Sequence, residues 1–102
     1  MIYTGRRDGR NTEILAGGEK LPSAGHLFRH SQQREWGHLG SEPAQLALDI
    51  LHHVTNDATF ALTYHQQFKQ EVISKLPIEG WTITTDEVYD WIQQNTPYNV
   101  TT

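Results

Sequence analysis

The chain has 102 residues, with 8 Lys and Arg, 12 Asp and Glu, and a formal net charge of −4. This length fits one domain that buries roughly two thirds of the surface exposed by its unfolded chain, and the acidic balance argues against a protein that neutralises many duplex-DNA phosphates. The absence of cysteine excludes disulfides, zinc–thiolate sites and cysteine nucleophiles. The chain starts with no apolar signal segment and has no apolar run of the roughly 18 residues that span a bilayer, so we expect a cytoplasmic protein that makes no membrane contact.

The N-terminal elements are two short β-prone runs, residues 2–7 and 12–15, separated by Asp8-Gly9-Arg10-Asn11. Gly and Asn adopt positive φ readily, so this arrangement predicts a β-hairpin. Residues 22–41 follow as a long polar segment with few large apolar side chains. A loop of this length in a small domain is either functional or fixed by packing.

Three helices are predicted, over about residues 42–55, 58–75 and 85–94. The first has Ser41 as N-cap, Pro43 in its first turn and one apolar stripe beyond them. Thr84 and Glu87 form a capping-box pattern for the third. Residues 81–84 are a strand candidate between the second and third helices.

The expected fold is therefore α+β, with a small two- or three-stranded sheet packed on three helices. The sheet consists of the N-terminal hairpin with or without the strand near 81–84. We expect residues 1–95 to form a single compact domain. The polar residues 96–102 are expected to be a flexible C-terminal tail.

The 30–41 loop is the candidate binding site, because its glycines let a ligand approach the backbone where a helix begins. A helix N-terminus favours phosphate, neighbouring arginines supply charge, and an indole offers a stacking face. The predicted ligand-binding residues are Arg6, Arg7, His30, Ser31, Trp36, Gly37, Gly40, Ser41 and Gln45. The alternative is structural: Ser41 caps the helix, the two glycines turn the chain and Trp36 fills the core.

Six histidines are many for a chain of this length. They show no spacing typical of a metal site, so we predict neither a metal nor a cofactor. Structural hydrogen bonding is one role for His30. General acid–base chemistry together with His38 is another, and it would make the protein a nuclease or a nucleotide-hydrolysing enzyme.

Several short motifs together resemble a known family. The motifs are Tyr3, Gly5-Arg6-Arg7, His30-Ser31, Glu35-Trp36-Gly37, Gly40-Ser41, Pro43-Ala44-Gln45-Leu46-Ala47, Phe68-Lys69, Leu76-Pro77, Gly80-Trp81 and Trp91. The chain resembles, over about residues 3 to 92, a family of small bacterial, archaeal and phage proteins known as a domain of unknown function. The Trp-Gly…Gly-Ser-x-Pro-Ala-Gln-Leu-Ala stretch is the most specific part. This chain departs from the family pattern at His38 and Glu42. The resemblance implies a compact domain of phage or mobile-element origin and brings no activity with it.

We therefore expect a small non-enzymatic binding module that uses the 30–41 loop. Its expected partner is a protein or a small phosphorylated ligand. Two alternatives stay open: the hydrolytic enzyme with His30 and His38, and a protein inhibitor of a host factor. A homodimer is a further expectation, and the expected location is the cytoplasm, that of the host cell if a phage encodes the protein.

Overall fold

The structure, a computed structural model, describes residues 1–97. Its sheet contains β1 (Ile2–Asp8), β2 (Asn11–Ala16), β3 (Glu19–Lys20) and β4 (Gly80–Thr84), all antiparallel, in the order β3-β2-β1-β4. The predicted hairpin is confirmed as β1 and β2. The predicted number of strands is wrong, because Gly17 and Gly18, both with positive φ, turn the chain back into the two-residue β3.

The last strand, β4, lies beside the first, β1, and not beside the strands that precede it in the sequence. Gly5 of β1 faces Trp81 of β4 in the register. A Cβ on Gly5 would lie 2.3 Å from the indole of Trp81. Only glycine at this position therefore leaves space for the Trp81 ring.

The helices are α1 (Ser41–Thr55), α2 (Ala58–Glu71) and α3 (Thr85–Asn95), with a 3-10 helix, η1 (Ile73–Lys75), after α2. The α+β class and the three helices are confirmed. The second helix is shorter than predicted, because Val72 leaves the helical conformation and the chain tightens into η1. The predicted capping box of α3 is confirmed: the side chains and backbone amides of Thr84 and Glu87 bond reciprocally.

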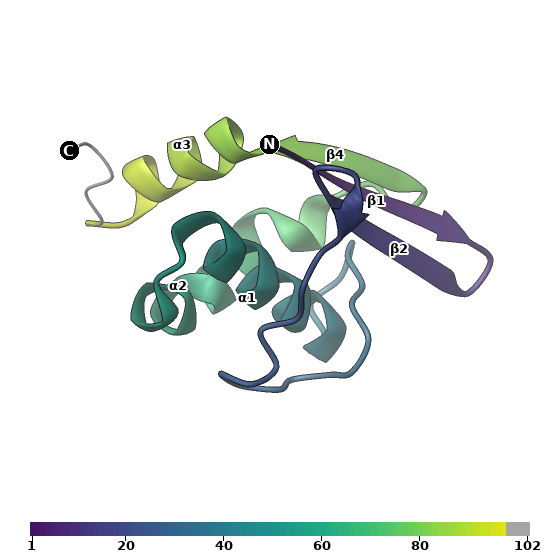
Figure 1. The fold of residues 1–102 in the computed structure, drawn as a ribbon, viewed down its shortest axis with the longest axis horizontal. Helices are drawn as coiled ribbons and strands as arrows, with labels where there is room; N and C mark the ends of the chain where they lie inside the picture. Colours follow the sequence, from purple (N-terminus) through teal and green to yellow (C-terminus); the bar gives the residue numbers. More distant parts are fainter. Residues whose placement is uncertain (98–102) are drawn as a thin grey trace.

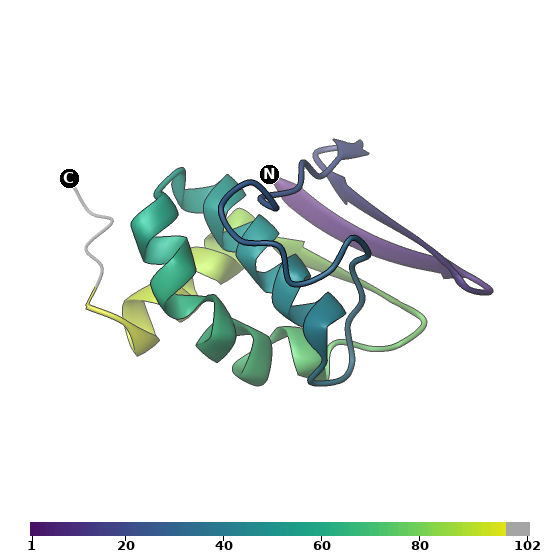
Figure 2. The same cartoon turned by 90° about the horizontal axis from the view of Figure 1, so that it is seen from below.

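Helices α1 and α2 lie on one side of the sheet, and α3 continues from the end of β4 (Figures 1 and 2). The core lies between the helices and the sheet. The alternation along β1 agrees with this arrangement, since Tyr3 and Gly5 are buried while Ile2 and Arg6 are exposed. Helix α1 is the centre of the domain. All nine of its residues 43–51 are buried, because α2 packs on it and the segment 21–40 crosses over it (Figure 2).

The predicted N-cap of α1 is wrong. Gly40 occupies the N-cap position, in an extended conformation and without a side-chain cap bond, and Ser41 is an exposed residue of the first turn. The first helical bond runs from the Ala44 N–H to the Gly40 carbonyl oxygen, so the helix begins one residue before the predicted boundary.

Most of the predicted C-terminal tail, residues 98–102, lies outside the described residues. Thr96 ends α3, and its N–H donates to the carbonyl oxygen of Ile92. Within residues 1–97, no helix is long and apolar enough to cross a bilayer.

The observed cap of α2 and the predicted cap of α1 give a matched test of stability. Asp57 accepts a hydrogen bond from the Phe60 N–H at 3.0 Å and caps α2. We expect Asp57→Ala to lower the free energy of unfolding by about 0.5–2 kcal/mol, because it removes a capping acceptor. We expect Ser41→Ala to change it by less than about 0.5 kcal/mol, because Ser41 caps nothing. Urea denaturation measures both, and an equal loss in the two variants would contradict the assignment of the caps.

Candidate functional site

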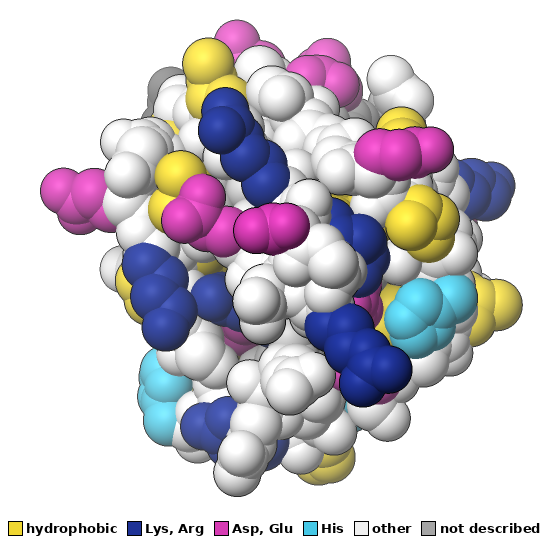
Figure 3. Space-filling view, turned by 90° about the vertical axis from the view of Figure 1, so that its right-hand side faces the viewer, with side chains coloured by type: hydrophobic (Ala, Val, Ile, Leu, Met, Phe, Trp, Pro, Cys, Tyr) yellow, Lys and Arg dark blue, Asp and Glu magenta, His cyan; other side chains and the backbone are white. Residues whose placement is uncertain are grey.

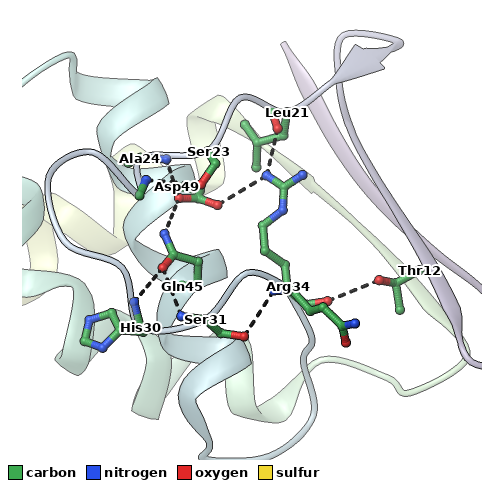
Figure 4. Close-up of polar contacts among 11 residues, drawn as sticks. Thr12, Leu21, Ser23, Ala24, His30, Ser31, Arg34, Gln45 and Asp49 are labelled. Atoms are coloured by element: carbon green, nitrogen blue, oxygen red, sulfur yellow. Dashed lines mark hydrogen bonds and ion pairs between the residues drawn. The ribbon is translucent and has the colours of Figure 1, made fainter.

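A pair of buried polar side chains on α1 organises the segment 21–40. Gln45 and Asp49 are each 1% exposed and lie one turn apart, which places them on the same face of the helix. The Gln45 amide donates to Asp49 Oδ1 at 2.9 Å. Figure 4 shows both side chains directed at the backbone of the segment that crosses α1.

The Asp49 carboxylate holds the start of this segment. Its Oδ1 accepts from the Ala24 N–H at 2.7 Å, and its Oδ2 pairs with Arg34 Nη1 at 3.2 Å. The same Arg34 nitrogen donates to the carbonyl oxygen of Leu21 at 2.7 Å. Burial raises the pKa of Asp49 above its ordinary value although these donors oppose the change. The Asp49 carboxylate thus accepts from Ala24, Arg34 and Gln45, and it links helix α1 to two positions of the segment 21–40.

Gln45 holds the middle of the segment. Its Oε1 accepts from the backbone N–H of His30 at 2.8 Å and from that of Ser31 at 3.3 Å (Figure 4). Three of the predicted site residues therefore come together. The Gln45 amide bonds to the protein itself and is almost fully buried, so in this structure it has no free group for a ligand.

A second anchor fixes the end of the segment. Trp36 is fully buried, and its Nε1 donates to the carbonyl oxygens of Pro77 and Ile78 at 2.8 and 3.1 Å. The Arg7 guanidinium lies 4.8 Å from the centre of the Trp36 ring and forms a two-bond ion pair with Glu35. Hydrogen bonding from Arg7 holds the pKa of Glu35 below its ordinary value.

These contacts change the predicted role of the loop. No ligand can stack on Trp36 while its side chain is fully buried, so the expectation of a stacking face is wrong for this structure and the core-filling alternative agrees with it. Gly37 turns the chain with a φ of +81°. Arg7 is engaged with Glu35, whereas Arg6 is exposed and alternates to the opposite face of β1. The structure does not bring Arg6 and Arg7 together.

His30 contacts a histidine that the sequence did not single out. Its Nε2 lies 2.7 Å from Nε2 of the buried His65. His65 Nδ1 lies 3.0 and 2.9 Å from the carbonyl oxygens of Ala61 and Leu62, so this nitrogen carries the proton. In the neutral pair His30 is therefore the donor to His65. His38 is exposed, and its ring lies beside Gly40.

The sequence did not predict the groove beside β2. The larger of two adjoining hollows has a volume of about 480 Å³ and is lined by Arg10, Asn11, Thr12, Glu13, Ile14, Leu15, Lys20, Gln32, Gln33 and Arg34. The smaller one, about 350 Å³, is lined by Lys20, Leu21, Pro22, Ser23, Arg29, Gln32 and Arg34. The two hollows share three residues, and together we call them the β2 groove.

The β2 groove is rich in positive charge. Four of the eight basic residues of the chain line it, with Glu13 as the one acidic side chain in its lining. Within residues 1–97, the side chains of Arg10, Lys20 and Arg29 have no hydrogen-bond or ion-pair partner. Seen from the side of the hairpin tip, basic side chains lie in both halves of the surface, whereas most visible acidic ones lie in the upper half (Figure 3). The groove residues come from separate segments, so no local motif could have revealed the site.

Comparison with known protein families identifies a match. The profile of a family described as "Family of unknown function (DUF6166)" matches residues 3–94, which is most of the chain. No curated protein and no solved structure matches the chain.

Gln45→Met tests the polar anchor. We expect it to lower the free energy of unfolding by about 1–3 kcal/mol, because methionine has similar size and helix propensity but leaves the backbone N–H groups of His30 and Ser31 without their acceptor. The amide protons of His30 and Ser31 should also exchange faster with solvent. Gln66→Met, at an exposed position of α2, is the control and should change stability by less than about 0.5 kcal/mol. Unchanged exchange at His30 and Ser31 would contradict the role of Gln45.

The histidine pair predicts a pH dependence of stability. Burial lowers the pKa of both His30 and His65 from 6.5, and nearby Lys69 lowers both further. As the pH falls through 6.5, the unfolded chain takes up protons that the folded chain resists. The free energy of unfolding therefore decreases, by at most about 1.4 kcal/mol per pH unit for each imidazole and by less for the partly solvated His30.

Urea denaturation between pH 7.5 and 5 measures this dependence. We expect His30→Gln to reduce the acid-induced loss, because the amide cannot take up a proton. His38→Gln, which changes an exposed ring outside the pair, should leave the slope as in the unmodified chain. An identical slope in His30→Gln would show that the pair does not set the pH dependence.

Proposed function

The chain belongs to the DUF6166 family of unknown function, and from this premise we propose that it is a non-enzymatic binding module that takes an anionic ligand in the β2 groove. The observation that carries this proposal is the concentration of four basic side chains and one acidic one along the groove in a chain with a net charge of −4. Like charges gathered on one surface create a local potential that attracts an anion.

The shape of the groove supports binding as well. Its larger hollow, about 480 Å³, lies within the range of about 300–1,000 Å³ typical of ligand sites. One wall is formed by Gln32, Gln33 and Arg34, which belong to the predicted 30–41 binding loop. The proposed site therefore includes part of the predicted loop. Its binding surface is formed by Gln32, Gln33 and Arg34 and not by Trp36.

The wall is fixed in place by bonds on two sides. The Arg34 guanidinium is held by Asp49 and by the carbonyl oxygen of Leu21, and the Arg34 carbonyl oxygen accepts from Thr12 Oγ1 at 3.2 Å. A surface that is ordered before binding loses less conformational entropy when a ligand arrives. Arg34 thus shapes the groove, while Arg10, Lys20 and Arg29 supply the unpaired charge.

The hydrolytic alternative has less support in the geometry. His30 Nε2 is engaged with His65, so only its Nδ1 is left for proton transfer, and within residues 1–97 no hydrogen bond or ring contact joins His30 to His38. The inhibitor of a host factor, the homodimer, the cytoplasmic location and the bacterial, archaeal or phage origin stay predictions.

Amide chemical-shift mapping with tripolyphosphate tests the site. We expect the largest shifts at residues 10–15, 20 and 32–34. The double variant Arg10→Glu/Lys20→Glu should weaken binding about tenfold or more, since each exposed ion pair contributes up to about 1 kcal/mol and reversal adds repulsion. Binding should also weaken as the salt concentration rises.

Lys69→Glu/Lys75→Glu is the matched control. It changes the net charge by the same amount at basic residues that do not line the groove. We expect its affinity for tripolyphosphate to stay within about twofold of the unmodified chain, because salt screens charges that lie outside the groove. No binding, shifts outside the groove, or equal losses in the two double variants would overturn the proposed function.

A further inference from the structure

We propose that the occupant of the β2 groove is an extended acidic segment of a partner protein. This inference rests on the anion-binding function proposed above and names the partner of that same site. Three features of the groove carry it: how its charges are distributed, which side chains line it, and which backbone and amide groups remain unpaired there.

The cations are spread along the groove. Arg10 lines only the larger hollow, Arg29 lines only the smaller one, and Lys20 and Arg34 border both. A compact phosphate is bound best by donors that converge on one point. A row of separated cations instead complements carboxylates that are themselves separated along a chain, so the distribution of charge favours an extended polyanion.

The lining favours a peptide over a nucleic acid. Proteins that bind single-stranded nucleic acids stack the bases on aromatic side chains, and none of the residues lining either hollow is aromatic. Trp36 belongs to the nearby loop but is fully buried.

Some polar groups of the groove have no hydrogen-bond partner within residues 1–97, and they match a peptide backbone. The Ile14 carbonyl oxygen accepts from the Leu21 N–H, so it points to the edge of β2 that faces the groove. In an antiparallel ladder alternate residues point to the same edge, which directs the N–H and C=O of Thr12 there too. The side-chain amides of Asn11 and Gln32, which also line this groove, each offer a donor and an acceptor, as a peptide unit does.

Competition between probes of different chemistry tests the inference. The unmodified chain is titrated by fluorescence anisotropy with a labelled ten-residue peptide of alternating Glu and Ser, with the same peptide carrying Gln for Glu, and with decathymidylate. Unlabelled ATP serves as a competitor. We expect the Glu peptide to bind at least tenfold more tightly than each of the other three. The double variant Arg10→Glu/Arg29→Glu reverses one charge in each hollow, and it should weaken binding of the Glu peptide at least tenfold. The control Lys69→Glu/Lys75→Glu should weaken binding of this peptide less than twofold.

Each outcome separates the two proposals. If decathymidylate or ATP binds as tightly as the Glu peptide and loses affinity in Arg10→Glu/Arg29→Glu, the partner class is wrong and the anion site stands. If the Gln peptide binds equally well, charge does not select the partner and the inference fails. If no probe binds, or both double variants weaken the Glu peptide equally, the β2 groove is not the site and the proposed function fails with it.

Discussion

The buried carboxylate of Asp49 is the interaction on which the unusual part of this domain depends. Residues 21–40 contain no helix or strand, yet their backbone polar groups need partners wherever the segment leaves water. Asp49 and Gln45 supply such partners from inside α1, to Ala24 at the start of the segment and to His30 and Ser31 in its middle. A long irregular segment is thereby held against a helix that it covers, with Trp36 as an apolar anchor near its end.

The same anchoring produces the candidate binding surface. The Arg34 guanidinium pairs with the buried Asp49, and the Arg34 carbonyl oxygen accepts from Thr12 on β2. These two contacts hold the loop beside the edge of the sheet, where it forms one wall of the groove. Three cations without an ion pair, Arg10, Lys20 and Arg29, line the groove beside that wall. Five of the eight basic residues thus have distinct positions: Arg7 and Arg34 form ion pairs with carboxylates of the protein, whereas Arg10, Lys20 and Arg29 line the groove.

The locally conspicuous residues of the 30–41 loop turned out to be mainly structural. Trp36 and Gly37 stand out in the sequence because an indole and a positive-φ glycine are rare and specific, and here that specificity serves packing and a turn. The histidine pair shows the same limit. His30 was visible as a candidate, but its contact with His65, 35 positions away, is made only when the loop lies on α2.

The sequence by itself determined the elements that rest on local physics. Helical periodicity, the β-turn at Gly9 and the capping box at Thr84 act between residues a few positions apart, so the hairpin, the three helices and the α+β class could be read from it. Only the tertiary structure decided that β4 lies beside β1, that α1 is covered on all sides and hides polar Gln45 and Asp49, and that cations from separate segments line one groove. These features depend on contacts between distant positions, and periodicity along one element carries no information about what packs on its other faces.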